Sequence, residues 1–264
     1  MSASHVRYTH GHHESVLRSH TWRTIANSAA YLEPELLPGR SLLDVGSGPG
    51  TITAELAERL APGRVVGLDA EPAIVAKAAA LGSPAEFVVG DALALPFEDD
   101  SFDIVHSHQT LQHLGDPVAA LTEMRRVVAP GGVVAVRDVD YAGVIWYPLI
   151  PALDDWLVLY HRLHRANGGE PDAGRRLKSW AREAGFREIV ATASIWAFES
   201  AGDRAWWGGL WAERALDSAF AVDAVERGHA TRADLERISA GWREWAADPD
   251  GWLAMPHGEV LARG

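Results

Sequence analysis

Short apolar runs alternate with Ala- and Leu-rich stretches along residues 41–138. The apolar runs read SLLDVG, RVVGLDA, AEFVVGDA, FDIVHSH and VVAVRDVD, and the stretches between them, such as TITAELAERLA and EPAIVAKAAALG, have helical character. Strands that alternate with helices at this spacing form βαβ units, whose strands run parallel. The pattern therefore predicts an α/β fold built on a parallel sheet.

The rest of the chain adds strands and helical insertions to this plan. Residues 187–198 and 251–263 read as two further strands, and a helical insertion over 201–247 separates them. Within that insertion Thr231 and Asp234 have the spacing of a helix capping box. A second insertion, over 141–169, leaves the end of the fifth strand and contains a helix.

The net charge and the amino-acid composition limit which partners and metals the protein is expected to bind. The net charge is −12, with Lys77 and Lys178 as the only lysines, which disfavours nucleic acid and anionic membranes as partners. The absence of cysteine excludes disulfides, cysteine-ligated metals and a thiol nucleophile. Several histidines lie near the N-terminus, but no cluster has ligand spacing, so we expect no metal. Neither a secretory signal nor a membrane-spanning run is evident, so we expect a cytoplasmic protein.

The segment LLDVGSGPG, residues 42–50, predicts a tight turn between the first strand and the next helix. Thr51 stands where the dinucleotide fingerprint requires a third glycine or alanine, and no Lys or Arg accompanies the loop to bind a pyrophosphate. Asp69 and Asp91 end the second and third strands, where carboxylates can accept hydrogen bonds from a ribose and an adenine amino group. These features favour an adenosine pocket without a phosphate clamp.

Four motifs in order, LLDVGSGPG, GLDA, GDALALPFEDDSFDIV and LTEMRRVVAPGG, resemble those of the class I S-adenosylmethionine-dependent methyltransferases. The nearest branch resembles the ubiquinone/menaquinone C-methyltransferases, and the resemblance covers about 41–198 and the final strand. It implies a Rossmann-like, doubly wound, seven-stranded sheet, mostly parallel with the last strand antiparallel, and S-adenosylmethionine as cofactor. The domain plan that follows is an N-terminal helical lid (1–40), cofactor-binding core (41–140), cap insertion (141–169), core continuation (170–200), helical insertion (201–247) and final core strand (248–264).

The resemblance also implies roles for individual residues. It assigns the ribose diol to Asp69 and the adenine to Asp91 with Ala92, and it places His108 and Gln109 near the sulfonium. The segment YTHGHHESVLRSHTWRT resembles a lid helix whose inward side chains would contact cofactor and substrate. The full set of expected cofactor contacts is Tyr8, His13, Gly46, Ser47, Gly48, Asp69, Ala70, Asp91, Ala92, His108 and Gln109.

Candidates for catalysis and substrate binding lie around the expected cleft. Asp138 and Asp140, at the end of the fifth strand, could orient a substrate, remove a proton or simply cap the next segment; His108 is the third catalytic candidate. Aromatic residues in the insertions suggest a pocket for a planar substrate. The expected substrate contacts are Arg23, Trp146, Tyr147 and Trp207.

The sequence therefore predicts methylation of a small molecule. The segment HSHQ after the fourth strand lacks the Asn/Asp-Pro-Pro-aromatic signature of nucleic-acid amino-methyltransferases. The quinone-type branch favours carbon methylation over O- or N-methylation, on a quinone-type ring or an aromatic or indole-like product of secondary metabolism. Two alternatives stay open: an NAD(P)-dependent oxidoreductase on a related fold, and a non-methylating S-adenosylmethionine-binding protein. The chain could act as a homodimer.

Overall fold

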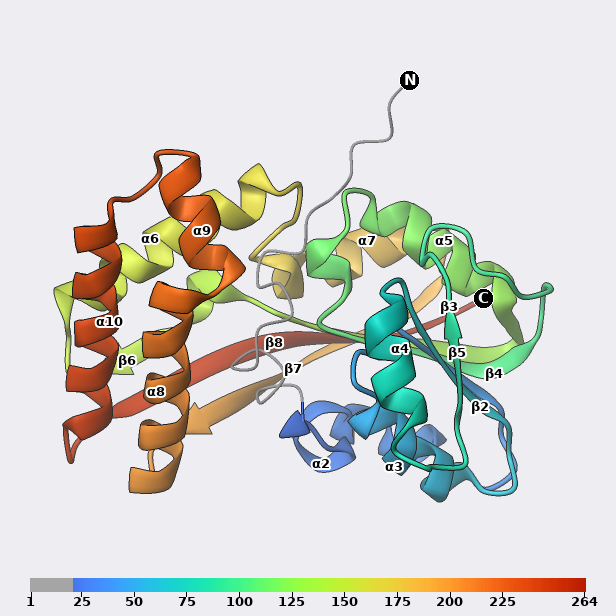
Figure 1. The fold of residues 1–264 in the computed structure, drawn as a ribbon. Helices are drawn as coiled ribbons and strands as arrows, with labels where there is room; N and C mark the ends of the chain where they lie inside the picture. Colours follow the sequence, from blue (N-terminus) through green and yellow to red (C-terminus); the bar gives the residue numbers. More distant parts are fainter. Residues whose placement is uncertain (1–20) are drawn as a thin grey trace.

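A single mixed sheet organises residues 21–264, the part of the chain that the computed structural model describes (Figure 1). Its strands run in the order β3-β2-β1-β4-β5-β8, with β6 and β7 both paired to β8. The strands are β1 (Leu42–Val45), β2 (Val65–Asp69), β3 (Glu86–Val89), β4 (Phe102–His108), β5 (Val128–Val139), β6 (Ile145–Tyr147), β7 (Glu188–Phe198) and β8 (Trp252–Arg263).

The strand directions confirm the predicted Rossmann-like arrangement. Strands β1 to β5 pair in parallel, whereas the last strand, β8, is antiparallel to both β5 and β7. The short strand β6 was not predicted. It follows a 3-10 turn at Tyr141–Gly143 (η3) and pairs with the start of β8, so that it continues the line of β5 after a break.

Helices cover both faces of the sheet because its side chains alternate between them. Leu43 and Val45 of β1 pack in one buried cluster with α5 (Pro117–Val127) and α7 (Leu177–Glu183). Leu42 packs in another cluster with α3 (Thr51–Leu60) and the 3-10 helix η1 (Ala30–Glu35). Helix α4 (Pro72–Ala79) contacts β2 and β3.

Local side-chain chemistry explains where helix α5 begins. The Asp116 side chain accepts a hydrogen bond from the backbone N–H of Ala119 at 2.9 Å, and Pro117 occupies the first turn. The helix ends before Pro130-Gly131-Gly132, because β5 already begins at Val128. A register shift against β4 absorbs these extra residues in the pairing.

Four helices form a cap at one end of the molecule, where β7 and β8 extend beyond the parallel strands (Figure 1). They are α6 (Pro151–Ala166), α8 (Ala201–Asp217), α9 (Ala219–Glu226) and α10 (Arg232–Ala247). Both helical insertions are thus confirmed as helical, and Thr231 and Asp234 form the expected capping box of α10.

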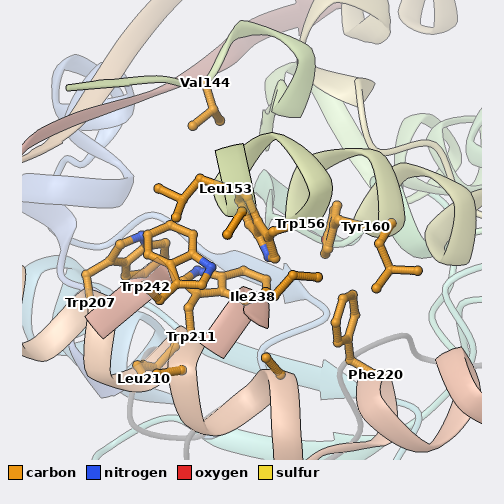
Figure 2. Close-up of a cluster of buried hydrophobic side chains, with 14 of the residues drawn as sticks. Val144, Leu153, Trp156, Tyr160, Trp207, Leu210, Trp211, Phe220, Ile238 and Trp242 are labelled. Carbon is orange, nitrogen blue, oxygen red and sulfur yellow. The ribbon is translucent and has the colours of Figure 1, made fainter. Parts of the chain in front are cut away.

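Tryptophans lie among the aliphatic and aromatic side chains that form the buried core of the cap (Figure 2). Trp156 of α6 lies edge-on to Trp211 of α8 and Trp242 of α10, with ring centroids 4.7 and 4.9 Å apart. All three side chains are fully buried. Each large ring removes a large apolar area from water, so this cluster holds the three helices together.

Of the predicted N-terminal lid, the structure describes only residues 21–40, which include α2 (Ile25–Ser28) and η1. Tyr8 and His13 lie outside the described residues. Trp22 packs edge-on against Trp196 of β7, with centroids 5.1 Å apart, and this contact ties the start of the described chain to the cap side of the sheet. Among residues 21–264, none of the helices has the length and apolar character needed to span a bilayer.

Candidate active site

A cavity of about 320 Å³ lies between the carboxyl ends of β1, β2 and β4 and the cap. This is the edge at which open α/β sheets bind ligands. One half, which we call the loop half, contains the predicted residues Gly46, Ser47, Gly48, Asp69 and Ala70. The other, which we call the cap half, contains Arg23, Tyr141, Trp196, Trp207, Arg214 and Met255.

The loop half depends on backbone conformations that favour glycine. Gly46 has φ of 77°, and a Cβ on it would lie 2.1 Å from the Thr110 hydroxyl oxygen. Gly48 has φ of 54°, and its N–H donates to the Asp69 carboxylate at 2.9 Å. The same carboxylate accepts a hydrogen bond from the N–H of Glu71 at 3.1 Å. Asp69 therefore fixes the turn after β1 from the end of β2.

Buried polar atoms around the cavity have no hydrogen-bond partner among the described residues. They include the hydroxyl of Ser47, Nε2 of His108 and Oε1 of Gln112. A buried polar atom left without a partner costs about 1 to 3 kcal/mol, so these atoms suit a ligand with polar groups of its own. Among residues 21–264, the carboxylates that line the cavity are Asp44, Asp69 and Glu71. All three belong to the loop half, which suits a ligand with a cationic or hydroxyl-bearing end.

Gln109 connects the two halves. It has φ of 52°, a left-handed conformation that is unfavourable for residues other than glycine. Its side chain accepts a hydrogen bond from Arg23 Nη2 at 2.6 Å, and its amide nitrogen lies 2.8 Å from His257 Nε2. Burial, aided by the positive charge of Arg23, lowers the pKa of the neighbouring His108 well below its usual value, so that imidazole is neutral at pH 7.

Asp138 and Asp140, the predicted catalytic carboxylates, do not line the cavity. Asp138 is buried under the 3-10 turn Leu111–His113 (η2) and accepts a hydrogen bond from the N–H of Gln112 at 3.2 Å. Burial raises its pKa to about 7. Asp140 forms two side-chain hydrogen bonds of 2.5 Å with Arg175 in the 3-10 helix Ala173–Arg176 (η4). Both carboxylates bond to neighbouring segments of the chain and lie outside the cavity lining, a placement that does not support proton removal at the cavity.

Two of the predicted substrate contacts also lie away from the cavity. Trp146 packs against Trp156 in the cap, with centroids 6.5 Å apart, and the Tyr147 side chain is 58% exposed. The pairing of β6 with the start of β8 carries both residues beyond the site. Trp207 and Arg23 do line the cavity, as predicted.

Asp91 and Ala92 are absent from the cavity lining among the described residues. Asp91 is exposed, and its side chain accepts a hydrogen bond from the N–H of Leu93 at 2.9 Å. Their contact with an adenine stays a prediction. In contrast, Tyr141, Trp196 and Met255 line the cavity without having been predicted, because each belongs to a segment whose local pattern indicates only a strand or a turn.

Comparison with known proteins identifies the family. A family model described as a methyltransferase domain matches residues 43–136. An uncharacterized methyltransferase of Schizosaccharomyces pombe is 32% identical over 267 residues, which cover 96% of this chain and 95% of that protein. The chain belongs to the class I S-adenosylmethionine-dependent methyltransferases.

Two further relatives of this methyltransferase bear on its cofactor and fold. A demethylmenaquinone methyltransferase of Roseiflexus castenholzii is 39% identical, over 61% of this chain and 66% of that protein. A Haemonchus contortus phosphoethanolamine N-methyltransferase 2, solved with S-adenosyl-L-methionine, superposes with a TM-score of 0.54 at 17% identity, over 89% of this chain and 51% of that one. The cofactor is S-adenosylmethionine, which leaves the nicotinamide-dependent alternative without support.

The loop half fits this cofactor. Its glycines allow close approach of a ligand, and the Ser47 hydroxyl has no partner among the described residues. Its carboxylates suit a ligand that carries an ammonium group and ribose hydroxyls. When bound, S-adenosylmethionine supplies an electrophilic methyl group on its sulfonium sulfur. The methyltransferase itself has to align an acceptor with that methyl group and exclude water, and the cap half stands in the position to do so.

Proposed function

We propose that this methyltransferase acts on a small aromatic molecule and transfers the methyl group to a ring carbon. The observation that carries the proposal is the aromatic character of the cap half, where Tyr141, Trp196 and Trp207 are buried and line the cavity. Flat apolar walls favour a planar acceptor over a flexible polar one.

Hydrogen bonding and stacking hold these walls rigidly. The indole N–H of Trp196 donates to the backbone carbonyl of Asn27 at 2.5 Å. Trp207 stacks on Phe198 with centroids 4.4 Å apart and an interplanar angle of 9°. Fixed walls lower the cost of ordering the site when the acceptor binds, and they support selection by shape.

Carbon methylation is favoured because the described lining of the cap half offers no effective general base. Transfer to a hydroxyl or amine requires a base that removes the proton of that group. Among the described residues, the lining of the cap half contains no carboxylate, and burial lowers the pKa of both His108 and His113 well below the usual value. An electron-rich ring carbon instead forms its bond to the methyl carbon directly; the sulfur keeps the electron pair of the broken bond, and the ring then releases a proton.

Two further observations support a small, quinone-type or related aromatic acceptor. A net charge of −12 opposes binding of a polyanionic nucleic acid. A demethylmenaquinone methyltransferase is similar to this chain over 61% of this chain's length, which supports the same class of acceptor. A role in secondary metabolism, a homodimer and a cytoplasmic location stay predictions.

The experiment is incubation with methyl-labelled S-adenosylmethionine and a panel of hydroquinones, naphthols, indoles and aromatic amines. We expect a mass gain of one methyl group, located on a ring carbon by NMR. Trp207→Ala should reduce turnover, and Trp206→Ala, which changes the neighbouring tryptophan that does not line the cavity, is the matched control. Transfer only to nitrogen or oxygen would refute carbon methylation, and cofactor binding without any transfer would favour the non-methylating alternative.

A further inference from the structure

Charged side chains divide along the cavity. The carboxylates Asp44, Asp69 and Glu71 lie in the loop half, and the guanidinium groups of Arg23 and Arg214 lie in the cap half. Arg137 lies buried behind the cap half, 5.0 Å from the ring centroid of Trp196, and is paired with the Glu259 carboxylate at 3.3 Å. The guanidinium groups that line the cavity therefore lie among the aromatic rings that would face the acceptor, and not beside the lining carboxylates.

A directed hydrogen-bond chain fixes Arg23 in the cap half. A guanidinium can only donate, so its bond to Gln109 makes Oε1 the acceptor and leaves the Gln109 amide nitrogen to donate to His257 Nε2. His257 then carries its proton on Nδ1, which donates to the carbonyl of Met255 at 3.1 Å. Burial and the charge of Arg137 lower the pKa of His257 well below its usual value, which keeps this ring neutral and the chain in one direction.

The tautomer of His108 follows from the same rule, that a guanidinium group can only donate hydrogen bonds. Its Nδ1 lies 3.5 Å from Nη1 of Arg137, which can only donate, so Nδ1 is the acceptor and the ring proton lies on Nε2. That nitrogen has no hydrogen-bond partner among the described residues, and the His108 side chain is only 5% exposed. The predicted catalytic His108 is thus a hydrogen-bond donor and not a general base.

We propose that the cap half selects an acceptor in its anionic form, a phenolate or enolate, with Arg23 as the specificity-determining cation and His108 as a donor to the anionic oxygen. This inference rests on the proposed function. An anion in a partly desolvated pocket interacts strongly with nearby positive charges, whereas a protonated amine there would be repelled.

The proposal also accounts for the missing base. A phenolate already carries the electron density that an unionised phenol gains only after it loses a proton. If binding favours the ionised form, the phenol proton passes to solvent before the reaction, and the ring carbon attacks without help from a carboxylate. The lining guanidinium of Arg23 then makes a general base unnecessary.

The test uses a nitronaphthol, whose phenolate absorbs visible light and whose ring is deactivated against methylation. It is titrated with pH in the presence of the full chain saturated with S-adenosylhomocysteine. We expect binding to lower the pKa of the probe by about one unit or more, as a cation does for a neighbouring acid. Arg23→Met should abolish most of that shift, and Arg23→Lys should restore part of it.

Arg182→Met provides the matched control, because Arg182 is exposed on α7 and does not line the cavity; the shift should be unchanged. An unchanged or raised pKa of the bound probe, or failure of the probe to bind, would overturn the inference. The panel of acceptors described above separates this inference from the proposed function. If either of those results is obtained but neutral indoles are methylated at carbon, the proposed function stands and only the selection of an anionic acceptor is refuted. Circular dichroism and cofactor binding establish that the Arg23→Met variant is folded.

Discussion

The two halves of the cavity are built in different ways. The loop half is made by a short stretch of backbone, in which Gly46 and Gly48 adopt conformations that favour glycine and Asp69 accepts a backbone hydrogen bond. The cap half is made by side chains from distant parts of the chain, among them Arg23, Tyr141 and Trp207.

This difference separates what the family shares from what this methyltransferase can vary. A backbone loop binds groups that every member must bind, and its sequence signal is local. The cap half depends on how α6, α8 and α10 pack, and we expect a change there to alter the acceptor without disturbing the cofactor. The predictions below test this separation, from the largest expected effect to the smallest.

Removal of one cap tryptophan should be the most damaging change. Trp156 is fully buried between two other rings, so Trp156→Ala should lower the free energy of unfolding by about 3 to 5 kcal/mol. Urea denaturation measures the loss. Trp252 is 39% exposed, and Trp252→Ala, its control, should cost about 1 kcal/mol or less. Equal losses in the two variants would mean that the cluster does not hold the cap together.

A methyl group on the glycine loop should act on cofactor binding. In Gly46→Ala the new Cβ would collide with Thr110, so the affinity for S-adenosylmethionine should fall by about 100-fold, equivalent to about 2.7 kcal/mol. Gly39→Ala is the matched control, since Gly39 also has a positive φ, of 90°, but a Cβ on it would meet no atom within 4 Å. That variant should lose about 1 kcal/mol of stability and keep its affinity, as calorimetry can check.

The buried Asp138 should make stability fall as pH rises. Burial raises its pKa from 3.8 to about 7, so between pH 4 and 7 the unfolded chain releases this proton more readily than the folded one. The stabilisation is therefore complete at low pH and lost as pH rises through about 7. Asp138→Asn removes this titration. As pH rises across that range, the unfolding free energy of the wild type should therefore fall by about 1 kcal/mol or more relative to that of the variant. A constant difference would contradict the buried, protonated carboxyl.

The ion pair between Asp140 and Arg175 should matter least. The Arg175 side chain is 56% exposed, so loss of the pair in Asp140→Asn should cost about 1 kcal/mol or less. We expect kcat to stay within about twofold of wild type, because the pair joins β5 to η4 away from the cavity. Arg175→Met should reproduce the same small loss of stability. A kcat reduced by orders of magnitude in Asp140→Asn would restore its catalytic assignment.

The amino-acid sequence by itself determined the parallel core, the loop half and the family. These depend on local rules: strand and helix periodicity, a capping Asp116 before Pro117, and glycines where the chain must turn at positive φ. Only the tertiary structure decided the roles of the carboxylates and aromatic rings. Asp138 and Asp140 follow each other closely at the end of β5, yet one is buried beneath η2 and the other is paired with Arg175.

Most of the residues that line the cap half could not be predicted from the sequence either. Met255 reaches the cavity beside Trp196, its partner in the antiparallel pairing of β7 with β8, and Trp146 misses it because β6 pairs with the start of β8. Sequence periodicity indicates which residues are buried but not which distant segment they meet. The register of β8, fixed by pairing with three strands, decides which side chains face the acceptor.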